Sequence, residues 1–116
     1  MKLRDIATQI QIDPRKLTEY ALNPDNPVGA DKALMFRQHL GFTQANHELL
    51  LQQIQLKAPD AEAIFQRTDE HRDRYQVDLD IIGIEEGQQE TVRTGWIVEP
   101  SRSTARLITL YVRRPS

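Results

Sequence analysis

The spacing of apolar residues changes once along the chain, at about Pro59. Before that point apolar positions recur three or four residues apart, which is the period of an amphipathic helix. After it they alternate with polar positions, which is the period of a strand with one buried face. We therefore expect one domain over residues 1–116, with a helical half at about 1–58 and a sheet half at about 59–113.

The helical half opens with an ambiguous segment, residues 1–12. Its apolar positions have helical spacing, but Ile10 and Ile12 also alternate as in a strand, and a short helix is favoured. A second helix is predicted after Asp13, because aspartate is a good N-cap and Pro14 suits the first helical position.

A rigid corner is predicted in residues 22–32, LNPDNPVGADK. Its two Asn-Pro pairs restrict the backbone, and Gly29 tolerates conformations that other residues avoid. The next helix is expected to end at Gly41, and a further one to run from Thr43 to just before Pro59.

Four segments of the sheet half have strand character: AEAIFQRT, YQVDLDIIG, TVRTGWIV and ARLITLYV. They are joined by short polar connections, including the loop EPSRST, and such neighbours pair antiparallel. The predicted fold class is α+β, with N-terminal helices packed on one face of a three- to four-stranded antiparallel sheet.

Alternation within these strands assigns side chains to two faces. The face toward the helices is predicted to hold Tyr75, Val77, Leu79, Val92, Trp96, Val98, Ile108, Leu110 and Val112. The open face is predicted to hold Asp78, Asp80, Arg93, Arg106, Thr109 and Tyr111, with Ile97 and Leu107. A single bulge would exchange the two faces beyond it.

Three residues of the open face are candidates for a site. The planar fork of Arg93 suits a phosphate or carboxylate, the Tyr111 phenol can stack on a base or donate a proton, and the Thr109 hydroxyl can bind an oxygen. Cross-strand Asp–Arg pairs and threonines are also ordinary on a solvated sheet, so both interpretations stay open.

Two further candidates lie outside the strands. Lys32 stands just after the corner, where it can bind an anion or serve as an ordinary surface lysine. His71, in the charged segment TDEHRDRY, is of the residue type most suited to proton transfer near neutral pH, but it can equally be a plain loop histidine.

Composition narrows the classes of function. Apolar residues make up 39% and charged residues 28%, there is no cysteine, and no apolar run reaches the length of a membrane span or signal peptide. We expect a cytoplasmic protein with no membrane association. The histidines lack metal-site spacing and no nucleotide-binding motif is present, so no metal and no cofactor are expected. A net charge of −2 argues against an overall attraction to nucleic acid.

The block KLTEYALNPDNPVGADKALMFRQHLGF, followed by YQVDLDIIG, ETVRTGWIVEP and RLITLYV, resembles an uncharacterised bacterial domain family with the pattern KLxxYxLNPxHPxGxxKAxxFxxxLGF and later VRTxW and LVTxYV strands. The resemblance covers roughly residues 12–112. Members of that family stand alone or form terminal modules of polymorphic toxins. This setting implies kinship with the barnase–EndoU–colicin–RelE ribonuclease superfamily, in which two helices precede a four-stranded antiparallel sheet and RNA lies on the open face.

The family pattern falls on Asn23, Pro24, Pro27, Gly29, Lys32, Ala33, Phe36, Leu40, Gly41, Arg93, Thr94, Trp96, Thr109 and Tyr111. Asn26 stands where the family often has histidine, so a proton-transfer role at that position is absent. The acidic pI, about 5.9, also departs from the usual basic ribonuclease toxin.

The resemblance implies a metal-independent endoribonuclease toxin that acts on RNA and has a small cognate antitoxin or immunity protein as partner. Arg93 and Lys32 would then meet phosphate charge, Tyr111 or His71 would transfer a proton or stack, and Thr109 would position the substrate. The alternative is a non-catalytic protein-binding module, such as an immunity- or antitoxin-like partner, that uses the open face with Ile97 and Leu107. A structural accessory domain with no site is a third interpretation.

Overall fold

The computed structural model describes residues 1–99 and 103–114 and confirms an α+β order. Residues 100–102 of the predicted EPSRST loop lie outside the described residues. The helical elements are α1 (Leu3–Ile6), the π-helical turn η1 (Lys16–Ala21), α2 (Ala30–Leu40), the 3₁₀ turn η2 (Gln44–Asn46), α3 (His47–Lys57) and the 3₁₀ turn η3 (Ala58–Asp60). The strands are β1 (Gln9–Gln11), β2 (Ala63–Asp69), β3 (Arg72–Ile82), β4 (Gln89–Val98) and β5 (Thr104–Arg113).

The sheet has five strands in the order β1-β5-β4-β3-β2, not three or four. β2 to β5 form the expected antiparallel meander, whereas β1 pairs parallel with the start of β5. The prediction of a short helix over residues 1–12 is right only for the single turn α1. In the three residues of β1, pairing with an otherwise unpaired strand edge satisfies backbone groups, and this outweighs a weak helical pattern.

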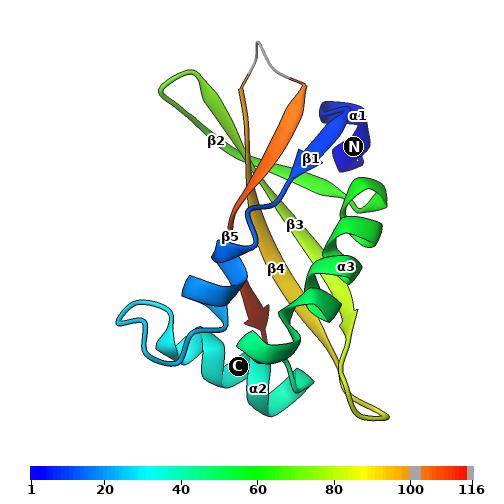
Figure 1. Cartoon of the computed structure of the whole chain (residues 1–116). Coiled ribbons are helices and arrows are strands. Elements are labelled where there is room, and N and C mark those ends of the chain that lie inside the picture. The colour runs from blue at the N-terminus through cyan, green and yellow to red at the C-terminus, as the bar shows by residue number, and fades with distance from the viewer. Residues whose placement is uncertain (100–102, 115–116) are drawn as a thin grey trace.

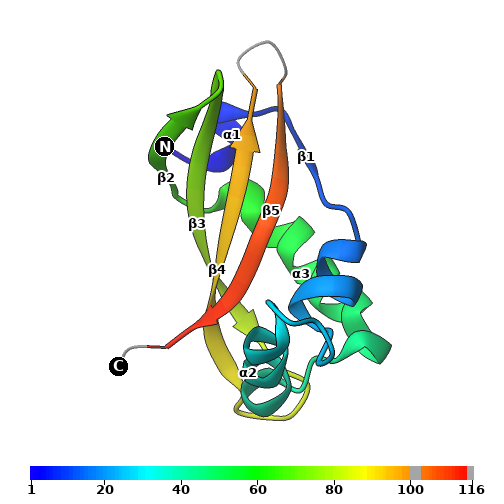
Figure 2. The same cartoon turned by 90° about the vertical axis from the view of Figure 1, so that its left-hand side faces the viewer.

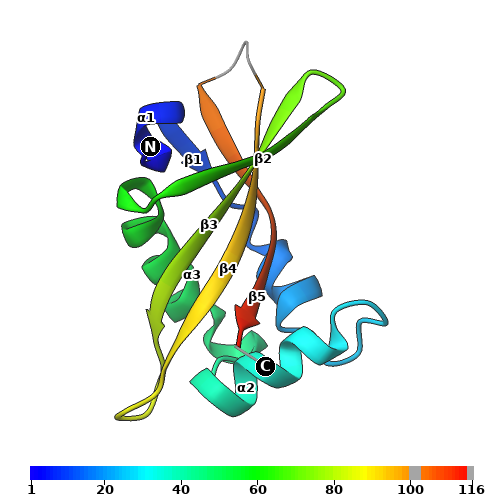
Figure 3. The same cartoon turned by 180° about the vertical axis from the view of Figure 1, so that it is seen from behind.

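The helices α1 and α3 lie on one face of the sheet, whereas η1 and α2 lie at the end where β5 extends beyond β1 (Figures 1 and 2). Seen from behind, most of β3 and β4 has no helix over it (Figure 3). One apolar core joins the helices to the sheet, and its fully buried members include Phe36, Leu40, Leu50, Ile54, Val77, Val92, Trp96, Leu107 and Leu110. Among the described residues, no helix combines the length and apolarity that a membrane crossing requires.

A bulge in β5 corrects the predicted faces. Gly95 is opposite Thr109, but the next residue, Trp96, is opposite Leu107, so Ile108 is the extra residue. Leu107, predicted on the open face, is therefore buried in the core, and Ile108, predicted in the core, lines a groove on the open face. A bulge puts two consecutive residues on one side of a strand, and a run of apolar residues contains no sign of it.

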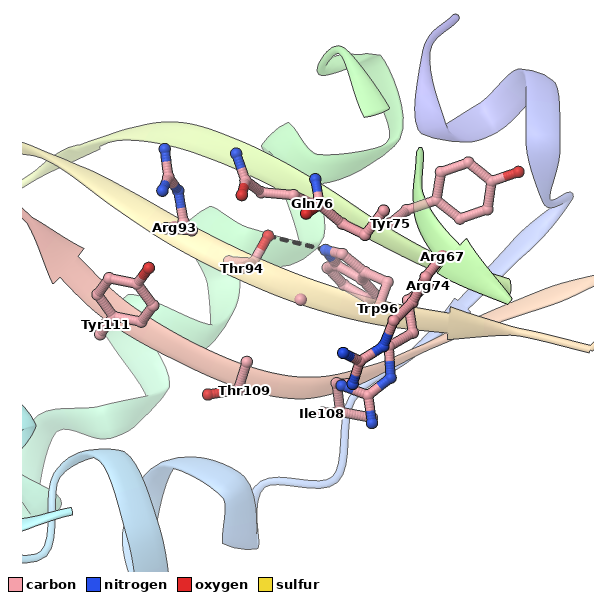
Figure 4. Close-up of a pocket in the computed structure, with 12 residues that line it drawn as sticks. Arg67, Arg74, Tyr75, Gln76, Arg93, Thr94, Trp96, Ile108, Thr109 and Tyr111 are labelled. Atoms are coloured by element: carbon pink, nitrogen blue, oxygen red, sulfur yellow. Dashed lines mark hydrogen bonds between the residues drawn. The ribbon is translucent and has the colours of Figure 1, made fainter. Parts of the chain in front are cut away.

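The structure agrees with the rest of the assignment of side chains to the two faces of the sheet, with two qualifications. Tyr75 packs only partly against the core and makes an edge-to-face contact with Phe65 of β2. Ile97 lies on the open face but is only 7% exposed. Thr94 is wholly buried, where its hydroxyl donates to the Val77 carbonyl at 2.6 Å and accepts from the Trp96 indole at 2.8 Å (Figure 4).

Candidate functional site

The open face carries a row of three polar side chains across the middle strands. Register places Asp78 of β3 opposite Arg93 of β4, and Arg93 opposite Tyr111 of β5. Arg93 donates from Nε to Asp78 Oδ1 at 2.9 Å and from Nη2 to Oδ2 at 3.2 Å. These bonds, and to a smaller extent the Tyr111 hydroxyl directed toward it, raise the pKa of Arg93 above its ordinary value (Figure 4). Arg93 is thus a cation that Asp78 holds in place, and some of its guanidinium N–H donors remain free.

Lys32 joins this row from the helical half. Its Nζ donates to the Tyr20 hydroxyl at 2.5 Å and to Thr109 Oγ1 at 3.2 Å. The same nitrogen lies 4.6 Å from the centroid of the Tyr20 ring and 5.5 Å from that of Tyr111, within the range of cation–π attraction. A lysine of α2, a tyrosine of η1 and two residues of β5 therefore form one cluster.

The Asn-Pro corner explains how Lys32 reaches β5. The Asn26 side chain accepts from the backbone N–H groups of Val28 and Gly29, both at 2.9 Å, and donates to the Glu19 carbonyl at 2.9 Å. These bonds tie the start of α2 to η1, which carries Tyr20. Asn26 therefore has a positioning role at the point where the resembling family often has histidine.

Gly29 lets α2 approach η1 closely. A Cβ at this position would overlap the Tyr20 carbonyl oxygen and lie 3.3 Å from Cδ1 of the Tyr20 ring. Gly29→Ala is expected to lower the free energy of unfolding by about 1–3 kcal/mol, because the added methyl overpacks against backbone. Denaturant unfolding measures this change. Val28→Ala is the control, since Val28 is 74% exposed and should shift stability little; equal stability of the two variants would contradict the close contact.

The hydrogen bond from Lys32, with its charge, makes Tyr20 more acidic than an ordinary tyrosine. Its hydrogen bond and positive charge lower the pKa of the Tyr20 phenol below the ordinary value, against partial burial, which raises it. A cation stabilises phenolate relative to phenol, so deprotonation moves to lower pH. For Tyr75, in contrast, burial and the nearby Asp73 carboxylate raise the pKa. Tyr20 is consequently suited to accept a proton.

A spectrophotometric titration tests this difference, because the chain has only three tyrosines. The first phenolate is expected to form below about pH 10, the ordinary tyrosine midpoint. Tyr20→Phe should remove that step, Lys32→Met should move it to higher pH, and Tyr75→Phe should leave it in place. If the step at low pH is still present in Tyr20→Phe, the acidic phenol belongs to another tyrosine.

The cluster borders a groove of about 390 Å³ on the open face. The lining includes Arg93, Thr109 and Tyr111 at one end and Arg67 and Arg74 toward the other (Figure 4). Gly95 keeps the floor low, because a Cβ there would lie 2.9 Å from the Thr109 methyl group. Guanidinium, hydroxyl and phenol groups thus surround a space open to solvent.

Four of the five candidate residues from the sequence meet here: Lys32, Arg93, Thr109 and Tyr111. His71 does not. It lies in the turn between β2 and β3, where Glu70 and His71 both have positive φ, at 47° and 68°. That turn is about 23 Å from Asp78 along the strand direction.

Sequence reasoning missed Tyr20, Arg67 and Arg74. Tyr20 is one of the fixed letters of the KLxxYxL pattern, but that pattern does not indicate its contact with Lys32. Arg74 has the same even parity as Asp78, so alternation along β3 indicates the face that they share. Among residues 1–99 and 103–114, no three His, Asp or Glu side chains are grouped so as to hold a metal ion.

Comparison with known proteins identifies a family for the chain but not for the site. A sequence model described as a domain of unknown function (DUF6883) matches residues 2–114. No curated protein and no solved structure matches the chain.

Proposed function

This chain belongs to the DUF6883 family of domains of unknown function, and we propose that it is a metal-independent endoribonuclease. The site is the cluster of Tyr20, Lys32, Arg93, Thr109 and Tyr111, defined here as the lysine–tyrosine cluster. The observation that carries the proposal is the position of Lys32, hydrogen-bonded to Tyr20 and Thr109 beside the Arg93–Tyr111 pair.

The free donors of this cluster suit a phosphodiester. A lysine ammonium has three N–H donors, and Tyr20 and Thr109 occupy two of those of Lys32. A guanidinium has five, and Asp78 occupies two of those of Arg93. Both cations therefore keep donors for the non-bridging oxygens of a phosphate, where charge develops during cleavage.

The reaction needs proton transfer at two oxygens. The Tyr20 phenolate, favoured by Lys32, accepts the proton of a ribose 2′-OH, and the 2′-oxygen attacks the adjacent phosphorus. The bond from phosphorus to the 5′-oxygen breaks, Tyr111 donates a proton to that oxygen, and a 2′,3′-cyclic phosphate remains. Thr109 holds Lys32 in place. The nucleophile belongs to the substrate, so the proposal is specific for RNA over DNA.

The resemblance to a family with polymorphic-toxin modules, and the kinship with the ribonuclease superfamily that it implies, also support this function, because in that superfamily RNA lies on the open face of an antiparallel sheet. A role as a toxin, neutralised by a small cognate antitoxin or immunity protein, belongs to the same proposal. Inducible expression would then arrest bacterial growth, and the Lys32→Met variant would not.

Cleavage of single-stranded RNA of mixed sequence, with a metal chelator present, tests the proposal. Shortened products with cyclic phosphate ends are expected, while an oligonucleotide of the same sequence with deoxyribose throughout stays intact. RNA that survives a large excess of folded protein would rule the activity out. If the chelator abolishes cleavage, the metal-independent mechanism is contradicted.

The same experiment distinguishes an endoribonuclease from the alternative, a non-catalytic protein-binding module. That interpretation used Ile97 and Leu107 as the apolar part of an open-face interface. Leu107 is buried in the core and Ile97 is only 7% exposed, so these two residues do not give the face an exposed apolar patch. A binding module leaves both RNA and growth unaffected.

A further inference from the structure

The groove has a second cationic end, at Arg67 of β2 and Arg74 of β3. Register places these two arginines directly opposite each other. Like charges at opposite positions destabilise a sheet, so the pair needs compensation. Both side chains lie against one carboxylate oxygen, Asp69 Oδ2, at 2.8 Å from Arg67 Nε and 3.0 Å from Arg74 Nε. One negative charge therefore serves two positive charges.

Asp69 satisfies these arginines unequally. Arg67 donates a hydrogen bond to it, whereas the Nε–H of Arg74 is buried and has no acceptor in the described part of the chain. The 3.0 Å contact of Arg74 is thus an ion pair without hydrogen-bond geometry. Within residues 1–99 and 103–114, no second carboxylate lies at ion-pair distance from either arginine. A surplus of positive charge and unused donors remains.

This surplus faces the same groove as the lysine–tyrosine cluster. Arg67 and Arg74 line it together with Arg93 and Tyr111, and their guanidinium groups meet beside Ile108 (Figure 4). The β5 bulge brings Ile108 onto the open face between the two cationic ends. Arg74 is about 13 Å from Asp78 along β3, a length that about four stacked nucleotides, or fewer extended ones, would span.

We infer that Arg67 and Arg74 form a second phosphate subsite, which binds the backbone of a single-stranded RNA a few nucleotides from the bond that is cleaved. The inference rests on the proposed function and adds a substrate class to it, namely strands longer than a dinucleotide. A phosphate entering here would replace like-charge repulsion with charge-assisted hydrogen bonds to two guanidinium forks. Phosphate contacts of this kind position a strand without reading its sequence.

Two probes test the subsite on the full chain: an octanucleotide with 2′-O-methyl sugars, which cannot be cleaved, and a cleavable dinucleotide with one phosphodiester. Arg67→Gln and Arg74→Gln are each expected to weaken octanucleotide binding by about tenfold. Each should also lower the slope of log affinity against log salt by about one. Asp69→Asn should strengthen binding, because it removes the competing carboxylate.

Arg4→Gln is the control, since it removes one positive charge from an arginine of α1 that pairs with Asp60. Relative to it, the ratio of kcat/KM for cleavable octanucleotide to that for dinucleotide should fall about tenfold in Arg74→Gln. Equal octanucleotide affinity and salt slope in Arg74→Gln, Arg67→Gln and the control would overturn the inference, as would a wild type that does not bind the octanucleotide.

The dinucleotide keeps the two proposals apart. A wild type that binds the octanucleotide through Arg67 and Arg74 but leaves the dinucleotide and longer RNA intact contradicts the proposed function, while phosphate binding by the two arginines stands. A wild type that cleaves RNA, with the two arginine variants unchanged in affinity, contradicts only the subsite.

Discussion

Lys32→Met is expected to lower kcat/KM for RNA cleavage by about 100- to 1,000-fold, the usual cost of removing one donor to a developing negative charge. The loss has two physical causes. The phosphate loses a cation, and Tyr20 loses the charge that lowers the pKa of its phenol. Methionine keeps most of the length of the side chain, so the space between α2 and β5 stays filled. Rates under single-turnover conditions measure the effect.

Lys2→Met is the matched control, because it removes the same charge from the exposed residue that precedes α1, and α1 lies at the other end of the molecule from α2 (Figure 1). It should cleave RNA at the wild-type rate, and both variants should unfold in a single transition. Lys32→Arg should keep part of the activity, since charge returns without the same geometry. A Lys32→Met protein within a few-fold of the wild type would remove Lys32 from the chemistry.

Arg93→Gln is expected to lower kcat/KM by about 100-fold or more. The substitution removes the guanidinium donors from the phosphate and leaves the Asp78 carboxylate without its partner, so the site loses one positive charge and holds an unpaired carboxylate. A stopped-flow measurement of RNA binding and cleavage in the same variant would show both KM and kcat affected.

The double variant Asp78→Asn/Arg93→Gln isolates the role of Arg93. Asparagine and glutamine restore charge balance across β3 and β4, so stability should return toward that of the wild type while cleavage does not. Recovery of wild-type cleavage in the double variant would mean that Arg93 only offsets Asp78. The ion pair would then be an ordinary feature of a solvated sheet.

Alternation predicted the middle of the site well. In β3 and β4 the period of two holds without interruption, so Asp78 and Arg93 were assigned to the same face, and the structure pairs them directly. In β5 the same rule was right for Thr109 and Tyr111 and wrong for Leu107 and Ile108. The segment Ala105–Val112 contains several apolar residues in succession, and a bulge among them leaves no mark in the hydropathy pattern.

Long-range contacts were beyond sequence reasoning. Helical spacing contains no information on the approach of η1, α2 and β5 to one another. That approach depends on the Asn26 hydrogen bonds and on the missing side chain of Gly29. The corner was predicted to be rigid, and its rigidity has a local cause. In contrast, Thr109, which accepts a hydrogen bond from Lys32, is 77 residues away along the chain.

The β2–β3 hairpin illustrates the same limit. Along the sequence, Arg67, Arg72 and Arg74 alternate with Asp69, Glu70 and Asp73, a pattern that is typical of a solvated mixture of charges. Pairing divides them: Arg72 lies near Glu70, whereas Arg67 and Arg74 share Asp69 at the edge of the groove. The bulge between Phe65 and Arg67 sets this register, and net charge alone could not predict it.

The most direct test is a crystal structure with an RNA oligonucleotide that carries one deoxyribose at the position of cleavage. The lysine–tyrosine cluster predicts a backbone phosphate within hydrogen-bond distance of both Lys32 Nζ and the Arg93 guanidinium, with the missing 2′-hydroxyl facing Tyr20. An oligonucleotide bound on the helical side of the sheet, or a groove that stays empty in a protein able to cleave the all-ribose strand, would contradict the account.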